Sequence, residues 1–102
     1  GMVAAAHPLA AQAGARLLIQ GGNAFDAIAA TAAALTVVEP FMSSLSGMGS
    51  ATLWSAAERR VSVLDFVPPI QKSFPAERFK QRSDLERGPH AVAMPGLSLI
   101  HI

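Results

Sequence analysis

The chain has 102 residues, enough for one small domain, and a formal net charge of +1. Hydrophobic residues make up 51% and charged residues 15%, against about 25% charged residues in ordinary globular proteins, so the chain is not intrinsically disordered. The near-neutral charge provides no basic field for nucleic acid. The absence of cysteine excludes a disulfide scaffold and a thiolate metal site.

Charged side chains are concentrated in the second half of the chain. Residues 1–57 contain only Arg16, Asp26 and Glu39, and the other charged residues all follow. A domain of this size cannot bury two apolar helices on all sides with its own mass. We therefore expect a piece of a larger protein, or a chain with a tight partner.

A first helix is predicted over residues 9–20, because Pro8 suits the first helical position. The glycine pair at 21–22 ends it, since glycine adopts the left-handed conformation of a helix C-terminus without a steric penalty. Ala10 and Gly14 lie four residues apart along this helix. Their small side chains define a face that another element can approach closely.

A second helix is predicted from Asn23, a preferred N-cap residue, to the residues before Pro40. Its side chains are apolar nearly all round, which is typical of a buried helix. The apolar run at 27–38 is shorter than the about 20 residues that a membrane-spanning helix needs. No membrane span is therefore predicted.

A β-hairpin is predicted in the second half, with strands over 51–56 and 61–67 joined by the short polar link at 57–60. Shorter strands are predicted over 2–6 and 90–94. A surface helix is predicted over 74–87, where the sequence is rich in charge. No internal repeat is evident.

The candidate chemistry in these residues is sparse. His7, His90 and His101 have no metal-ligand spacing, so neither a metal nor an organic cofactor is predicted. The loop at 46–50 lacks the glycine and lysine pattern of phosphate loops, and nucleotide binding is an alternative that depends on this loop alone. Asp65 is either a hydrogen-bonded strand-end carboxylate or part of a site.

The loop glycines at 47 and 49 are predicted to provide turn dihedral angles that other residues avoid. The residues taken one by one thus predict no active site. They predict a buried piece of an α/β or α+β domain.

Several short motifs nevertheless occur in a specific order, namely GMVA at 1–4, GGNAFDA at 21–27, VEP at 38–40, SGMG at 46–49 and LDF at 64–66. Over residues 1–96 this order resembles the start of the large subunit of γ-glutamyltranspeptidases, which are N-terminal nucleophile hydrolases. The resemblance implies an α+β fold, part of a four-layer αββα sandwich that this chain does not complete.

The resemblance also implies an activity. Family precursors cut themselves just before a threonine, whose freed amine and hydroxyl act as base and nucleophile. The γ-glutamyl group of glutathione or a related amide passes to the threonine, and then to water or an amino acid. This threonine is expected downstream, so no catalytic residue is predicted in this chain, and the chain alone is predicted to be inactive. The implied partner is the remainder of the precursor, later the small subunit.

A departure from the family occurs after the LDF motif, where the family has an arginine that pairs with the α-carboxylate of the glutamyl substrate. This chain has Val67 there, the candidate substrate-binding position, and valine cannot bind a carboxylate. A buried carboxylate that lacks its partner loses roughly 3–5 kcal/mol, by analogy with a broken buried ion pair. Either Arg59 or Arg60 replaces the missing cation, or the acyl group is not a free glutamyl.

Three interpretations follow from these observations. The chain belongs to a γ-glutamyl transferase or hydrolase, to a paralogous amidase or acylase with altered acyl specificity, or to a non-catalytic assembly module. The N-terminus has no basic stretch before an apolar run, so no signal peptide is predicted, although the family resemblance is compatible with a periplasmic or extracellular location.

The chain ends on an atypical segment. Residues 97–102 read LSLIHI, whereas natural termini are usually exposed and polar. We expect residues 1–96 to form the N-terminal part of a large subunit. Residues 97–102 are expected to be a tail produced by truncation or by a non-native reading frame.

Overall fold

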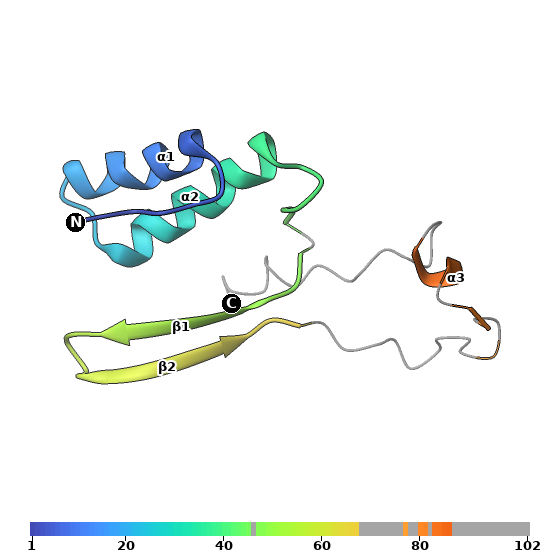
Figure 1. The fold of residues 1–102 in the computed structure, drawn as a ribbon. Helices are drawn as coiled ribbons and strands as arrows, with labels where there is room; N and C mark the ends of the chain where they lie inside the picture. The colour runs from blue at the N-terminus through green and yellow to red at the C-terminus, as the bar shows by residue number, and fades with distance from the viewer. Residues whose placement is uncertain (46, 68–76, 78–79, 82, 87–102) are drawn as a thin grey trace. The chain divides into compact units, whose positions relative to one another are not determined.

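The computed structural model describes residues 1–45, 47–67, 77, 80–81 and 83–86. The chain divides into two compact units, Gly1–Leu45 and Ser46–Ile102. The described elements confirm the predicted α+β class. They are helices α1 (Pro8–Ile19) and α2 (Ala24–Val38) in the first unit, and strands β1 (Ser50–Ser55) and β2 (Arg60–Asp65) and the short helix α3 (Ser83–Glu86) in the second (Figure 1).

Helix α1 begins and ends one residue earlier than the predicted range of 9–20, with Pro8 and the glycine pair at its two ends as the sequence indicates. Pro8 occupies the first turn, and the His7 side chain caps the helix by accepting a hydrogen bond at Nδ1 from the Leu9 amide, at 3.2 Å. At the other end Gly21 has a φ of 93°, a backbone conformation that glycine adopts without a Cβ penalty. The Gly22 amide then donates to the Leu17 carbonyl oxygen at 2.8 Å, which closes a Schellman-type C-terminus.

Helix α2 begins with a reciprocal capping box. Asn23 Oδ1 accepts hydrogen bonds from the amides of Phe25, at 2.8 Å, and Asp26, at 3.1 Å. Asp26 Oδ2 in turn accepts from the Asn23 amide at 2.8 Å. Amide groups that have no partner within the helix are thereby satisfied, and the Asp26 charge lies at the positive end of the helix dipole. The predicted N-cap is confirmed.

Replacing Asn23 with alanine is expected to lower the free energy of unfolding by about 1 kcal/mol, because the two amides lose their acceptor. Asn23→Ser is the matched control, since its hydroxyl is also an efficient cap, and it should change stability by only a few tenths of a kcal/mol. Urea unfolding of the full-length protein measures both variants. Equal losses in the two variants would show that the side-chain acceptor is not what stabilises this helix end.

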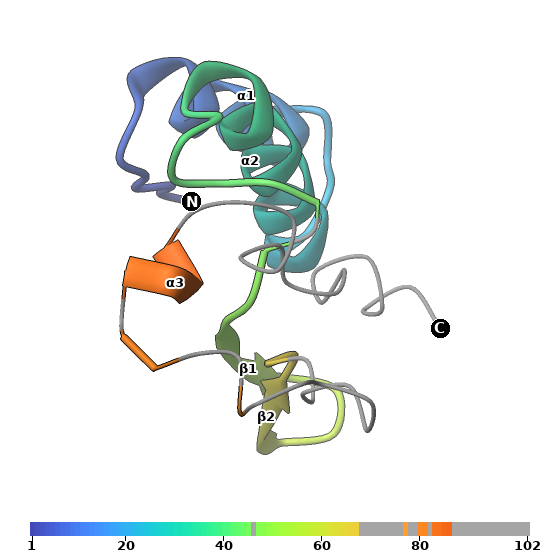
Figure 2. The same cartoon turned by 90° about the vertical axis from the view of Figure 1, so that its right-hand side faces the viewer.

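Helices α1 and α2 pack against each other through small residues (Figure 2). Ala10 and Gly14 of α1 are buried, as are Ala27 and Thr31 of α2. A Cβ atom added at Gly14 would lie 2.7 Å from the Ala27 carbonyl oxygen and closer still to Thr31 Oγ1. The close approach predicted at Ala10 and Gly14 is therefore confirmed, and its partner is α2.

The apolar segment at residues 2–6 forms no strand, contrary to the prediction. It runs back along the first unit instead, with Gly1 beside Leu18 and Val3 beside Gly14. The reason is that the described residues of this unit provide only helices, so the segment has side chains to pack against but no strand to pair with.

The prediction that α2 is buried is wrong for this chain as it stands. Within the part of the chain that the structure describes, Ile28 is 53% exposed and Val37 is 78% exposed, although both belong to the apolar helix. The residues of α1 are too few and too small to cover α2 on more than one side. The exposed apolar surface is what the sequence predicts for a chain that needs more protein to cover it.

Strands β1 and β2 form the predicted hairpin, each one residue earlier in the chain than expected at its start. They pair antiparallel, with Ser50 opposite Asp65 at one end and Ser55 opposite Arg60 at the other. The connecting loop, residues 56–59, contains Arg59 at a φ of 52°, a left-handed conformation that is uncommon outside glycine. Trp54, Val61 and Val63 share the exposed face of the hairpin.

The remaining predictions concern residues that the structure describes only in part. Of the helix predicted over 74–87, the described residues are 77, 80–81 and the four residues of α3, and residues 80 and 81 are not helical. The strand predicted over 90–94 and the segment at 97–102 lie outside the described residues.

Candidate functional site

The candidate substrate-binding position, Val67, lies just beyond the end of β2. The ladder ends at Asp65, so Val67 has no partner in the sheet. Its amide donates instead to Asp65 Oδ1 at 3.1 Å, a turn in which an aspartate side chain binds the backbone two residues on. The Val67 side chain is 56% exposed within the described chain. The hydrogen bond from the Val67 amide confirms the interpretation of Asp65 as a hydrogen-bonded strand-end carboxylate.

The glycine-containing loop meets the LDF motif at this same end of the hairpin. The Phe66 amide donates to the Gly49 carbonyl oxygen at 3.0 Å. A Cβ atom added at Gly49 would lie 3.0 Å from Cε2 and Cζ of the Phe66 ring. Gly49 is thus needed for close approach of an aromatic ring. The prediction that Gly49 provides a left-handed dihedral angle is wrong. Gly49 does not have a positive φ, whereas Gly21 does.

Replacing Gly49 with alanine is expected to lower the free energy of unfolding by about 1–2 kcal/mol, because the Phe66 ring must shift to admit the methyl group. The double variant Gly49→Ala with Phe66→Leu tests the cause. If the ring contact is responsible, the two changes together should cost less than the sum of their separate effects. Strictly additive effects in thermal unfolding would contradict the contact.

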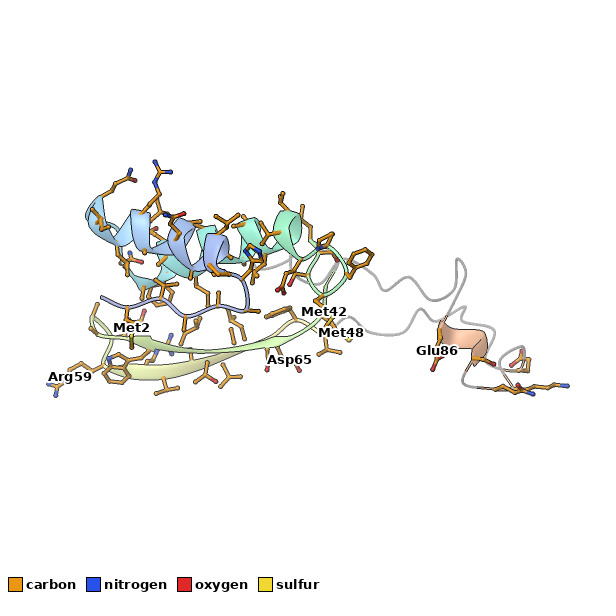
Figure 3. The ribbon with its side chains drawn as sticks, turned by 45° about the horizontal axis from the view of Figure 1, so that its top comes forward. Met2, Met42, Met48, Arg59, Asp65 and Glu86 are labelled. Carbon is orange, nitrogen blue, oxygen red and sulfur yellow. The ribbon has the colours of Figure 1, made fainter. Side chains whose placement is uncertain are left out.

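The two cations considered as replacements for the missing arginine lie at the opposite end of the hairpin from Val67. Figure 3 shows Arg59 and Asp65 at the two ends of the strand pair. Arg60 pairs with Ser55 beside the loop, and it lies five residue steps along the strand from Asp65, about 17 Å at 3.3 Å per residue. Arg60 is also in an ion pair with Glu58. Neither arginine replaces a guanidinium at position 67 in this arrangement.

The described residues contain no metal-ligand set, because no three histidine, aspartate or glutamate side chains come together among them. His7 caps a helix, and His90 and His101 lie outside the described residues. None of the helices of the described part has the length and apolar character to cross a membrane.

Sequence reasoning proposed Val67 and Asp65 as candidates but missed the contact of Gly49 with the Phe66 ring. The contact between Gly49 and Phe66 depends on the register of the hairpin, which brings residues far apart in sequence together. The glycine itself was the available signal, since glycine in or next to a strand marks close approach of another group.

The sequence pattern of the family described as "Gamma-glutamyltranspeptidase" matches residues 10–99. The chain is 41% identical over 108 aligned positions to an acylase ACY 1 proenzyme of Pseudomonas sp. strain SE83, covering 94% of this chain and 19% of that protein. It is 45% identical over 65 residues to a glutathione hydrolase proenzyme of Bacillus subtilis, covering 64% of this chain and 11% of that protein.

A solved structure shows the same fold. The γ-glutamyltranspeptidase of Helicobacter pylori superimposes with a TM-score of 0.78 at 32% identity, over 95% of this chain and 29% of that chain. The chain therefore spans about a fifth or less of the curated relatives just described, and under a third of the solved chain. The family match covers most of its residues and agrees with the ordered motifs, so the chain belongs to the γ-glutamyltranspeptidase family.

Proposed function

We propose that residues 1–96 are the N-terminal part of the large subunit of a self-cleaving γ-glutamyltranspeptidase-type enzyme. The enzyme takes an acyl group from an amide and passes it to water or to an amine. The observation that supports this is the family match over residues 10–99, together with relatives that are proenzymes of hydrolases and acylases. The nucleophile is a threonine outside these residues, so the 102-residue chain alone is inactive and its partner is the remainder of the precursor.

Two substrate classes fit this activity. The first is γ-glutamyl amides such as glutathione, in keeping with the relative named a glutathione hydrolase. The second is amides whose acyl group has no free α-carboxylate, in keeping with the relative named an acylase. Val67 favours the second class, because valine carries no charge to pair with a carboxylate and Arg60 of the hairpin lies at the other end of the strand pair.

The arginines at the turn support the same choice. If Arg59 or Arg60 substituted for the missing guanidinium, the γ-glutamyl class would be favoured. Their position at the far end of the hairpin is evidence against that alternative. In this proposal a valine at position 67 removes the selection for an α-carboxylate while the amide-cleaving machinery elsewhere in the protein is retained.

The experiment that tests the activity itself uses the full-length precursor. Intact-mass measurement after purification should show two chains, with the smaller beginning at a threonine, and the mature protein should release 4-nitroaniline from an acyl 4-nitroanilide. Replacing that threonine with alanine should abolish both events. A precursor that stays uncut and inactive would favour the assembly-module interpretation.

A further inference from the structure

The two described residues after the ladder of the hairpin, Phe66 and Val67, are held by contacts other than sheet pairing. Phe66 is tied to Gly49 by a backbone hydrogen bond of 3.0 Å and by the packing of its ring against the glycine. Val67 is tied by its amide to Asp65 Oδ1 at 3.1 Å. Pro68 follows in the sequence and restricts the residue before it to extended conformations. The backbone at position 67 is therefore constrained from both sides.

The Asp65 carboxylate is the element in this arrangement that acts directly on position 67. Asp65 forms the last pair of the ladder, opposite Ser50, so the sheet positions Asp65 itself. Its side chain then accepts a hydrogen bond from the amide of Val67, a residue beyond the last pair of the sheet. Without this acceptor, the φ of Val67 would be limited only by Phe66 before it and Pro68 after it.

We infer that Asp65 is a positioning residue for acyl-group selection, since its hydrogen bond to the Val67 amide fixes the direction in which the side chain at position 67 leaves the strand. The inference rests on the proposed function in one respect, namely that position 67 contacts the acyl group. Asp65 itself need not touch substrate. Its effect is on which acyl groups bind well, through the residue two positions on.

The backbone part of the inference is tested by amide hydrogen exchange in the full-length mature protein labelled with ¹⁵N-valine. The Val67 signal is identified by its loss in the Val67→Arg variant. Asp65→Ala is expected to speed exchange at Val67 by about tenfold, because the amide loses its acceptor. Asp65→Asn keeps a carbonyl oxygen acceptor and should stay within about twofold of the parent. Unchanged exchange in Asp65→Ala overturns the inference.

The selectivity part is tested with two substrates that differ only in the carboxylate, γ-glutamyl 4-nitroanilide and 4-aminobutyryl 4-nitroanilide. In the Val67→Arg background, Asp65→Ala is expected to lower the preference for the γ-glutamyl compound by about tenfold, mainly through KM, and Asp65→Asn should preserve it. Thr36→Val is the control, since it removes another exposed side-chain-to-backbone hydrogen bond, in α2. It should leave the preference unchanged.

The outcomes separate the inference from the proposed function. If Val67→Arg creates no preference for the γ-glutamyl compound, the role proposed for position 67 fails, and the exchange experiment still decides whether Asp65 holds the backbone. If the preference appears but Asp65→Ala leaves it intact, position 67 selects the acyl group without help from Asp65, and the inference is overturned. Equal losses in Asp65→Asn and Asp65→Ala would also overturn it, since the acceptor would then not matter.

Discussion

Replacing Gly14 with alanine is expected to lower the free energy of unfolding of the full-length protein by about 2–3 kcal/mol, the scale of overpacking in a closely packed interface. Alanine is the better helix former by about 1 kcal/mol, so helix propensity alone predicts stabilisation. The packing effect is opposite in sign and larger. The new methyl group would lie 2.7 Å from the Ala27 carbonyl oxygen, a backbone atom that moves only if α2 moves.

The second obstacle at Gly14 is the Thr31 side chain, which is itself anchored. Thr31 Oγ1 donates to the Ala27 carbonyl oxygen at 2.8 Å, so rotating it away breaks a buried hydrogen bond. Adding Thr31→Ala to Gly14→Ala should recover part of the loss, because the hydroxyl contact disappears while the carbonyl contact remains. Gln12→Ala is the matched control, since it introduces the same residue at an exposed position of α1.

Urea unfolding of these variants measures the effect. A Gly14→Ala protein as stable as Gln12→Ala would show that α1 and α2 do not approach as closely as their small residues indicate.

Replacing Val67 with arginine is expected to raise kcat/KM for γ-glutamyl 4-nitroanilide relative to 4-aminobutyryl 4-nitroanilide by about 30-fold. A guanidinium forms a bidentate, charge-assisted pair with a carboxylate, and about 2 kcal/mol of such binding corresponds to this factor. The compound without the carboxylate has nothing for the new side chain to bind. Its turnover should therefore stay the same or fall.

Two controls test the reason for this gain. Val67→Met introduces a long side chain without charge and should leave the ratio of the two kcat/KM values close to that of the parent. Arg60→Ala should also leave the ratio unchanged, because Arg60 lies at the turn end of the hairpin. If Arg60→Ala or Arg59→Ala instead lowered γ-glutamyl turnover selectively, one of these arginines would be acting as the replacement cation.

The parts of the fold that depend on neighbouring residues were predictable from sequence. The caps of α1 and α2 follow from Pro8, Asn23 and the glycine pair at 21–22, since each acts within one helical turn. The small-residue face at Ala10 and Gly14 was also predictable from the sequence, because a spacing of four residues places them on one side of a helix. Sequence alone did not identify α2 as the partner.

The features that depend on distant residues were not predictable. The hairpin strands begin one residue earlier than expected because the loop carries its left-handed residue at Arg59, and no glycine or asparagine marks that position. The role of Gly49 required the strand register. The burial of α2 was predicted from its composition alone, and the described residues of this chain do not contain enough protein to cover it.

The candidate residues of the site were predictable from the sequence, but the contacts between them were predictable only in part. The resemblance to the family predicts Val67 in place of an arginine, and the strand pattern predicts Asp65 as a strand-end carboxylate. The hydrogen bond that joins them, and the distance that separates Arg60 from them, required the folded hairpin.

The most direct measurement is the ratio of kcat/KM for γ-glutamyl 4-nitroanilide and 4-aminobutyryl 4-nitroanilide in the mature protein with Val67 in place. Both compounds are expected to be turned over at a ratio within about threefold of one, because no cation at position 67 distinguishes them. A preference of about 30-fold or more for the γ-glutamyl compound would show that another cation binds the α-carboxylate, and would contradict the role assigned to Val67.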